Sequence, residues 1–273
     1  MKKKRVDILA VRQGLFPTRE KAKRAIMAGK VVSNFSGERF DKPGETISEA
    51  TMLRIKREVS PYVSRGGVKL AKAVKFFDLT LKNKIVLDIG ASTGGFTDVA
   101  LQNGAKIVYA LDVGINQLDW KIRQDARIIV MEQINFRYAK PARFTQGLPN
   151  IATIDVSFIS LRLMFEPLHK ILKVDGEVIA LIKPQFEVGK DQIGKNGIIY
   201  DKKNHKQAIQ NVLQSAIEFN FDILKLDFSP ITGRKGNIEF LSHLRKSANK
   251  GTIAQSINVG EIVDAAHENF SVN

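Results

Sequence analysis

The sequence predicts an α/β protein in which helices cover both faces of a mostly parallel sheet, preceded by a smaller α+β domain. From residue 84 onward, short runs rich in β-branched residues alternate with helix-like stretches. Those runs are apolar over almost their whole length, as expected of strands that are buried on both sides. The excess of positive charge concentrates in the first 59 residues, which indicates a separate unit there.

The composition limits the classes of function. The chain has 273 residues, a formal net charge of +15 and no cysteine, so disulfides and thiolate nucleophiles are excluded. The four histidines lack metal-ligand spacing, and we predict no metal site. No apolar run is long enough to span a membrane and the N-terminus lacks a signal peptide, so we expect a cytoplasmic protein. The charge fits a polyanionic partner or simply a basic soluble protein.

The first 59 residues carry a net charge of +8, whereas the other 214 residues carry +7. Residues 5–14 (RVDILAVRQG) place apolar side chains at helical spacing and predict a first short helix. Thr18 is a good N-cap for a second helix, which carries an apolar stripe and ends at Gly29. KVVSN (residues 30–34) and TMLRIKRE (51–58) read as short strands. This segment therefore predicts a small basic α+β domain over residues 1–59.

The stretch RVDILAVRQGLFPTREKAKRAIMAGKVVSN resembles the S4-like RNA-binding domain found in several RNA-modifying enzymes. The alternative is a solvated basic face without a partner, although few acidic residues balance the second helix. The resemblance implies contacts between folded RNA and the basic residues of this domain, and Arg65 is added from the segment that follows it. The predicted RNA-binding residues are Arg5, Arg19, Lys21, Lys23, Arg24 and Arg65.

After a linker at residues 60–64 (SPYVS), residues 65–273 predict the second domain. Its strands are expected at residues 84–90, 106–114, 127–131, 150–157 and 176–184, with a last strand near 236–244. Helices are expected at 64–77, 95–104, 116–125 and 159–172. Ligands of such sheets bind at the carboxyl ends of the strands.

The loop DIGASTGGF (residues 88–96) follows the first of these strands at that edge. A phosphate-binding loop would carry a lysine after its last glycine, and a dinucleotide loop would have a different glycine spacing. A carboxylate before the first glycine suits a cationic amino group, and Asp112, at the end of the next strand, suits a ribose diol. Together these features predict S-adenosylmethionine binding; a purely structural turn is the alternative. The predicted cofactor contacts are Asp88, Gly90, Ala91, Ser92, Gly94, Gly95, Phe96 and Asp112.

Four ionisable residues fall near the ends of predicted elements. Lys69 lies near the start of a helix that Ser64 is expected to cap, Asp155 and Lys183 close two strands, and Glu239 lies in the last strand. For each of these residues alone, the simpler interpretation is a solvated side chain or a helix or turn cap. Together they indicate a site, because the sheet would bring three of them to one edge.

These four residues match the lysine–aspartate–lysine–glutamate tetrad of FtsJ-like ribose 2′-O-methyltransferases. The order of YVSRGGVKL, DIGASTGGFTD, IDVSFISL, LIKPQFE and GNIEFL behind an RNA-binding module is similar to that of the TlyA (haemolysin A) family. The resemblance implies a Rossmann-like class I S-adenosylmethionine-dependent methyltransferase domain, with seven strands of which the last is antiparallel. It also implies that the substrate is ribosomal RNA, alone or within a ribosomal subunit.

In this interpretation a lysine with a depressed pKa removes the proton of the 2′-hydroxyl. We assign that role to Lys183, with Lys69 as its neighbour and Asp155 and Glu239 as the residues that orient both amines. The polar segment 186–199 (FEVGKDQIGKNGII) is expected to be a mobile flap or a plain connection. The alternatives are a non-catalytic RNA-binding or ribosome-assembly factor and a membrane-lytic haemolysin, although no membrane partner is expected. The sequence leaves the oligomeric state open.

Overall fold

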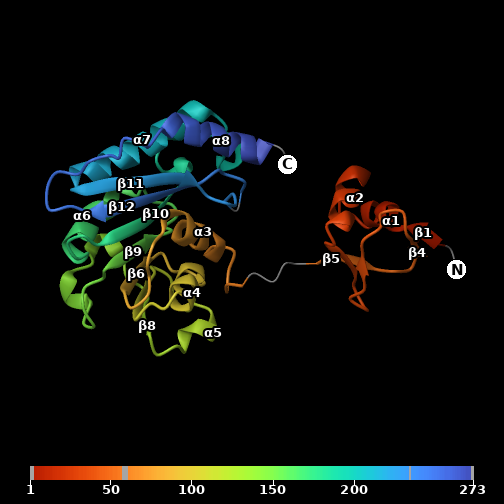
Figure 1. The fold of residues 1–273 in the computed structure, drawn as a ribbon, viewed down its shortest axis with the longest axis horizontal. Helices are drawn as coiled ribbons and strands as arrows, with labels where there is room; N and C mark the ends of the chain where they lie inside the picture. The colour runs from red at the N-terminus through yellow and green to blue at the C-terminus, as the bar shows by residue number, and fades with distance from the viewer. Residues whose placement is uncertain (1–2, 57–60, 234, 272–273) are drawn as a thin grey trace. The chain divides into compact units, whose positions relative to one another are not determined.

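The computed structural model describes residues 3–56, 61–233 and 235–271 (Figure 1). The chain divides into two compact units, residues 1–59 and residues 60–273, which are described separately. No helix within the described ranges is both long and apolar enough to cross a membrane.

The first unit contains both predicted helices, α1 (Val6–Arg12) and α2 (Arg19–Met27). Thr18 caps α2 as expected, because its hydroxyl accepts a hydrogen bond from the backbone N–H of Lys21 at 3.3 Å. Gly29 has a φ of +66° just after the helix, the backbone conformation that favours glycine at this position.

Short strands complete the first unit in two small antiparallel sheets. The predicted strands are present as β2 (Val31–Ser33) and β5 (Leu53–Ile55), which form a sheet in the order β3-β2-β5. The last two residues predicted for the second strand, 57 and 58, lie outside the described residues. The strands that the sequence did not indicate are β1 (Lys3–Arg5), β3 (Arg39–Phe40) and β4 (Thr46–Ser48), of which β1 pairs with β4.

A compact core joins these elements, because the apolar stripes of both helices face the strands. Its fully buried members include Val6, Ala10, Ala22, Ile26 and Val31.

The second unit has a seven-stranded sheet in the order β11-β12-β10-β9-β6-β7-β8. Its strands are β6 (Ile85–Ile89), β7 (Ile107–Leu111), β8 (Ile128–Met131), β9 (Ile151–Ile154), β10 (Glu177–Ile182), β11 (Phe221–Phe228) and β12 (Phe240–Lys246). Only β12 runs antiparallel to its two neighbours. The predicted α/β class, with seven strands and an antiparallel last strand, is confirmed. The position of β11 was not indicated by the sequence.

Helices cover both faces of this sheet (Figure 1). One face packs against α3 (Gly67–Phe77), α4 (Gly95–Gln102) and α5 (Trp120–Arg123), and the other against α6 (Arg162–Ile171), α7 (Lys202–Glu218) and α8 (Val259–Ser271). The alternation of side chains along each strand supplies both cores: in β6, Leu87 and Ile89 face the second set of helices and Val86 faces the first. The helix expected at 116–125 is only the four-residue α5.

Residues 61–64, expected as a linker, pack against α4. The backbone N–H of Val63 donates to the Asp98 carboxylate at 2.8 Å, and the Gln102 amide donates to the carbonyl of Pro61 at 3.0 Å. Ser60, the first residue of that linker, lies outside the described residues. The prediction that Ser64 caps α3 was wrong: the N-cap is Gly66, without a side-chain hydrogen bond. The Ser64 hydroxyl instead lies where a Cβ on Gly95 would be, so these segments pack too closely for a larger residue.

Candidate active site

The sheet and α3 bring all four residues of the predicted tetrad together at the carboxyl edge. Asp155 follows β9 and Lys183 follows β10, so neighbouring parallel strands place them at the same edge. Glu239 immediately precedes β12 rather than lying within it, and the pairing of Ile182 with Phe240 places it beside Lys183. Lys69 reaches the same point from the first turn of α3.

The four side chains form a connected set of ion pairs. Lys183 Nζ lies 2.6 Å from Asp155 Oδ1, and Lys69 Nζ lies 2.7 Å from Glu239 Oε2. Asp155 joins the two pairs, because its Oδ2 lies 3.7 Å from Lys69 Nζ. Lys69 and Lys183 are only 8% and 7% exposed. Two amines and two carboxylates thus balance in charge within a largely desolvated cluster, as buried charges require.

Glu239 is the most buried member of this cluster. Burial raises the pKa of its carboxyl, while the charges of Lys69 and Lys183 act in the opposite direction. A Cβ on Gly233 would lie 2.6 Å from Glu239 Oε1, so the loop between β11 and β12 lies directly against this carboxylate. The loop backbone therefore helps to exclude water from one side of the tetrad.

Two further residues beside Lys183 were missed. The Lys183 amine donates to Ser157 Oγ at 2.9 Å. Phe158 has a φ of +64°, which costs a residue other than glycine about 1–2 kcal/mol. Its ring is 91% exposed and its centroid lies 5.3 Å from that of Phe186. In the sequence both residues lie in the stretch DVSF (residues 155–158), directly after the predicted site residue Asp155, but their residue types alone give no sign of these contacts.

Glu187 holds the segment that contains these residues. Its buried carboxylate accepts hydrogen bonds from Ser160 Oγ at 2.6 Å and from the backbone N–H of Leu161 at 2.8 Å. Burial raises the pKa of Glu187, and these two hydrogen bonds partly oppose that shift. Because strained backbone persists only where its surroundings fix it, Glu187 is a structural reason why Phe158 keeps its conformation.

Segment 186–199, the predicted flap, contains the short 3-10 turns η4 (Lys190–Gln192) and η5 (Lys195–Gly197). Asn237 anchors its far end: the side-chain amide donates to the carbonyl of Gly197 at 2.8 Å and accepts from the N–H of Ile199 at 2.9 Å. The motion expected of this segment stays a prediction.

The glycine loop lies next to the tetrad. Gly90 has a φ of +83°, and a Cβ there would lie 2.7 Å from the carbonyl oxygen of Asp155. Asp112 braces the loop, because its carboxylate accepts hydrogen bonds from the N–H groups of Ser92 and Gly114 at 2.8 and 2.7 Å. Glycine at position 90 therefore lets the loop turn closely against the end of β9.

Asp88 differs from the expectation that it faces a cationic ligand. It is 1% exposed and accepts hydrogen bonds from the hydroxyls of Thr97 and Thr153 at 2.7 and 3.0 Å. Burial raises the pKa of Asp88 to about 6. Of the predicted cofactor contacts, Gly90, Ser92 and Asp112 retain exposed surface, whereas Asp88, Ala91, Gly94, Gly95 and Phe96 are buried.

The surface that remains fits S-adenosylmethionine. The partly exposed carboxylate of Asp112 can accept hydrogen bonds from sugar hydroxyls. Val113, Ile115 and Trp120 follow it in the chain and expose apolar side chains that suit an adenine ring. Gly90 and Ser92 complete this surface beside the tetrad.

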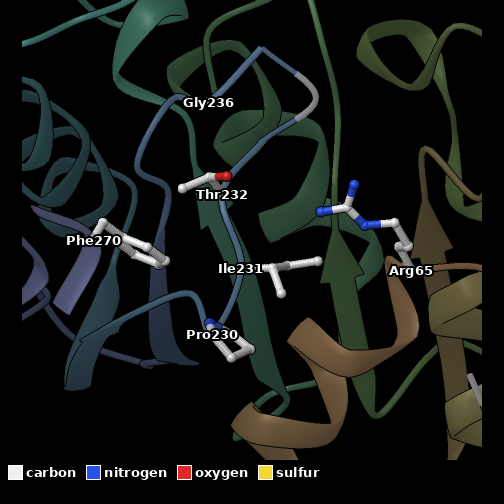
Figure 2. A pocket seen from close by; sticks show the side chains of 6 residues that line it. All are labelled: Arg65, Pro230, Ile231, Thr232, Gly236 and Phe270. Carbon is white, nitrogen blue, oxygen red and sulfur yellow. The ribbon is translucent and has the colours of Figure 1, made fainter. Parts of the chain in front are cut away.

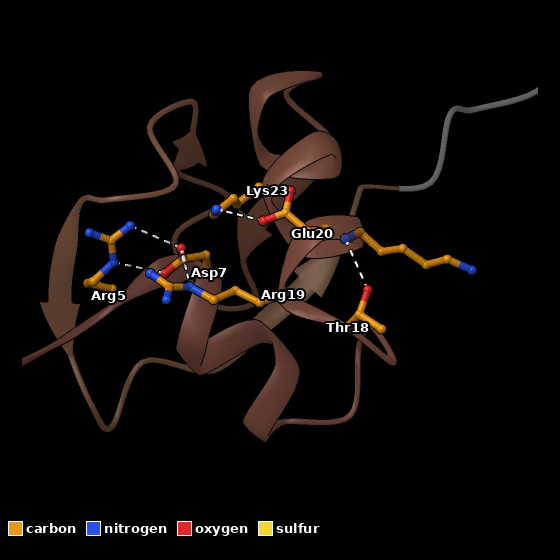
Figure 3. A network of polar contacts seen from close by, with 7 residues as sticks. Arg5, Asp7, Thr18, Arg19, Glu20 and Lys23 are labelled. Carbon is orange, nitrogen blue, oxygen red and sulfur yellow. Dashed lines mark hydrogen bonds and ion pairs between the residues drawn. The ribbon is translucent and has the colours of Figure 1, made fainter.

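The predicted RNA contacts of the first unit fall into two groups. Arg5 and Arg19 both bind the buried carboxylate of Asp7, with N–O distances between 2.9 and 3.1 Å (Figure 3). Lys23 Nζ lies 2.7 Å from Glu20 Oε1 on the same helix. The remaining two, Lys21 and Arg24, are exposed, and Arg65 belongs to the second unit.

The parallel sheet, its glycine loop and the adjacent tetrad define a methyltransferase fold and site. Residues 62–246 match the model of the FtsJ-like methyltransferases, so the chain belongs to that family. The predicted family resemblance is thereby confirmed, and S-adenosylmethionine is the cofactor.

Relatives extend the similarity beyond this domain. The chain is 52% identical to a candidate rRNA methyltransferase of Bacillus subtilis, YqxC, covering 98% of this chain and 95% of that protein. It is 36% identical to the 16S/23S rRNA (cytidine-2′-O)-methyltransferase TlyA of Mycobacterium tuberculosis, with coverages of 98% and 97%. A candidate hemolysin structure from Streptococcus thermophilus has a TM-score of 0.78 and 55% identity, covering 100% of this chain and 98% of that one.

Proposed function

We propose that this protein transfers a methyl group from S-adenosylmethionine to the 2′-hydroxyl of a ribose in ribosomal RNA. Two relatives that align with almost the whole chain are named for rRNA methylation, one of them for cytidine 2′-O-methylation. The observation that carries the proposal is the buried contact of 2.6 Å between Lys183 and Asp155, adjacent to the glycine loop. Acting on ribosomal RNA, the protein would work in the cytoplasm.

Lys183 would act as the base. In its neutral form its Nζ accepts the proton of the 2′-hydroxyl, and the oxygen then forms a bond to the methyl carbon. When bound, S-adenosylmethionine would supply the methyl group as a sulfonium, whose sulfur becomes a neutral thioether on transfer. Asp155 and Ser157 fix the direction of the Lys183 amine through contacts of 2.6 and 2.9 Å. A fixed amine can take the proton from a 2′-hydroxyl whose oxygen is aligned for in-line attack. The proton leaves Lys183 to solvent after the product departs.

Lys69 and Glu239 would support this step without taking the proton. Their ion pair keeps a positive charge beside Asp155, which limits repulsion between the two carboxylates. Phe158 is exposed and follows Ser157, the hydrogen-bond partner of Lys183, so it suits a base that has left its stack, since aromatic side chains recognise unstacked RNA bases.

The first unit would hold folded RNA. Arg5 and Arg19 keep part of each guanidinium at the surface while Asp7 fixes it, and Lys21 and Arg24 add exposed charge. Such fixed cations suit phosphate contacts, which position a nucleic acid without reading its sequence.

Substitution of Lys183 tests the proposal. Lys183→Ala should reduce transfer from labelled S-adenosylmethionine to ribosomal subunits by roughly 10³-fold, because the proton acceptor is lost. Its affinity for rRNA should remain within a few-fold of the wild type. Retained transfer in this variant would remove Lys183 from the base role.

Lys246→Ala is the matched control. Lys246 is also a partly buried lysine, but it donates to the carbonyls of His169 and Leu172 at the opposite edge of the sheet. Its loss should lower stability by about 1–3 kcal/mol and leave transfer intact below the melting temperature.

The rival functions give different results with the wild type. A non-catalytic assembly factor would bind subunits and transfer no methyl group to any of them, whereas a membrane-lytic protein would release dye from liposomes. Mapping 2′-O-methyl marks on rRNA treated with the wild type would also identify the nucleotide.

A further inference from the structure

We propose that a cavity beside the tetrad binds the nucleotide adjacent to the methylated one in the RNA chain. The proposal rests on the proposed function and assigns a second nucleotide position to the same site. The cavity has a volume of about 370 Å³, within the usual range of roughly 300–1,000 Å³ for small-ligand sites. It is lined by Arg65, Pro230, Ile231, Thr232, Gly236 and Phe270 (Figure 2).

The fold places this cavity directly next to the reacting centre. Four of the lining residues, Pro230, Ile231, Thr232 and Gly236, belong to the connection between β11 and β12 that also carries Glu239. Gly233 in that connection lies against the Glu239 carboxylate. Arg65 precedes α3, the helix that carries Lys69 in its first turn. The two segments that line the cavity around Arg65 and residues 230–232 therefore lead directly to the two members of the Lys69–Glu239 ion pair.

The order of the strands places the cavity and the glycine loop on opposite sides of the tetrad. Along the carboxyl edge, the β11–β12 connection comes first, then Lys183 after β10, Asp155 after β9, and the glycine loop after β6. The methyl donor side is thus separated from the cavity by the proposed base. An RNA strand whose ribose reaches Lys183 would extend its neighbouring nucleotide toward the cavity.

The cavity combines the two chemical features of a nucleotide. Pro230, Ile231 and Phe270 provide an apolar wall, and Figure 2 shows Arg65 and Phe270 on opposite sides of Ile231. Within the described part of the chain, no hydrogen bond or ion pair occupies the exposed Arg65 guanidinium. A flat base can stack on the apolar wall while its phosphate binds the guanidinium, and Thr232 adds a hydroxyl for hydrogen bonding.

The apolar wall is held by packing and hydrogen bonds around it. The ring of Phe270 packs edge-on against Phe228 at a centroid distance of 6.1 Å. The carbonyl of Phe228 accepts a hydrogen bond from Lys72 at 2.6 Å, and the carbonyl of Ile231 accepts one from Ser229 at 2.6 Å. Because these groups are fixed before RNA binds, little side-chain freedom has to be lost on binding.

Steady-state kinetics of the full chain provide the first test. Arg65→Gln and Phe270→Ala should each raise the KM for rRNA about tenfold, the effect expected for one stacked base or phosphate contact. The kcat and the affinity for S-adenosylmethionine should stay near wild-type values. In the double variant, the KM for rRNA should rise by less than the product of the two single increases, because both residues bind the same nucleotide.

Two substitutions outside the cavity are matched controls. Arg245 is an exposed arginine at the opposite edge of the sheet, where it pairs with Asp222, and Phe76 is a 60% exposed phenylalanine on α3. Arg245→Gln and Phe76→Ala should leave the KM for rRNA unchanged. Equal effects in the control and cavity variants, or none in either, would overturn the proposal.

A direct binding test does not depend on methyl transfer. Phe270→Trp introduces an indole into the cavity, and the wild type, with Trp120 as its only tryptophan, provides the fluorescence background. Cytidine 5′-monophosphate at millimolar concentration should quench the added fluorescence, ribose 5-phosphate should not, and a further Arg65→Gln change should weaken the quenching.

The two tests separate failure of the cavity from failure of the proposed function. If the nucleotide quenches the fluorescence of a protein that transfers no methyl group, the proposal that the cavity binds a nucleotide is supported and the proposed methyltransferase function is refuted. Normal methyl transfer with no quenching and an unchanged KM in both cavity variants would reject the cavity alone.

Discussion

Asp7 in the first unit and Glu239 in the second are both buried carboxylates beside two cations, yet their pKa values shift in opposite directions. For Asp7, burial raises the pKa, but the hydrogen bonds and charges of Arg5 and Arg19 outweigh it and the net shift is downward. For Glu239, burial raises the pKa and outweighs the opposing effects of Lys69 and Lys183. The same ingredients therefore give opposite results.

The difference lies in where the cations are. The side chains of Arg5 and Arg19 are 41% and 48% exposed, so water covers their outer faces and Asp7 lies just beneath the surface. The side chains of Lys69 and Lys183 are 10% and 9% exposed, so most of the tetrad is shielded from water. The first network thus holds fixed positive charge at the surface, whereas the second holds its charges in a largely dehydrated cluster beside the glycine loop.

Removing a lysine from the desolvated network should have the largest effect. Lys69→Ala leaves Glu239 buried without its nearest cation, which should cost about 3–5 kcal/mol of stability. Methyl transfer should fall by roughly 10²–10³-fold because Lys183 and Asp155 lose their alignment. Thermal unfolding and single-turnover transfer measure the two effects. Lys75→Ala, an exposed change on the same helix, is the control and should alter neither.

Glu239→Gln removes the buried charge while keeping the shape. Because the pKa of Glu239 is raised, the folded state binds more protons than the unfolded state at pH values just above the usual pKa of a glutamate. Stability therefore falls as pH rises through that window, and the glutamine variant should lose this dependence. Transfer should drop by roughly 10–10²-fold. A pH profile of stability identical to that of the wild type would contradict the assignment of Glu239 as a buried, destabilising charge.

Asp7→Asn should act on RNA binding and acid stability rather than on chemistry. The pKa of Asp7 is lower in the folded state than in the unfolded state. Its charge therefore stabilises the folded protein at pH values above the unfolded-state pKa, and this contribution is lost as the pH falls through the folded-state pKa. The free energy of unfolding of the variant should be about 1–3 kcal/mol lower at neutral pH. It should also lack the loss of stability that the wild type shows on acidification through the pKa of Asp7. Its rRNA affinity should fall about fivefold, or roughly 1 kcal/mol, with kcat unchanged.

The Asp7 effect on RNA should depend on Arg19. If Asp7 acts by holding Arg19, Asp7→Asn should have little further effect on affinity in an Arg19→Gln background. Additive losses in this double-mutant cycle would show that Asp7 has only a structural role.

Part of the site could be predicted because parallel strands end at one edge. Asp155 and Lys183 follow neighbouring strands, so the sequence was sufficient to bring them together. The contact between Lys69 and Glu239 depends on how α3 packs beside the antiparallel β12, and strand periodicity carries no information about that packing.

Other features could not be predicted from local pattern. Asp88 was expected at the end of the first strand with its carboxylate facing a ligand, but its side chain lies on the face of β6 that it shares with Val86, which α3 and α4 cover. Strands β1 and β4 are three residues each and pair across some forty residues, so neither has a local signal. The positive φ of Phe158 has no local signal either, and the carboxylate that holds the following residues, Ser160 and Leu161, belongs to Glu187, which is distant in sequence.

The smallest predicted effect compares two lysines of α2. Lys21 is exposed and no ion pair to it occurs among the described residues, whereas Lys23 pairs with Glu20 at 2.7 Å. If Lys21 binds a phosphate, Lys21→Gln should reduce the slope of log affinity against log salt by about 0.9, the value for one phosphate contact. Lys23→Gln should reduce it by less, because Glu20 already neutralises that amine and must release it to RNA. Equal slopes in the two variants would mean that the ion pair with Glu20 does not determine which lysine contacts RNA. In that case only the total positive charge of this unit would determine the salt dependence of RNA binding.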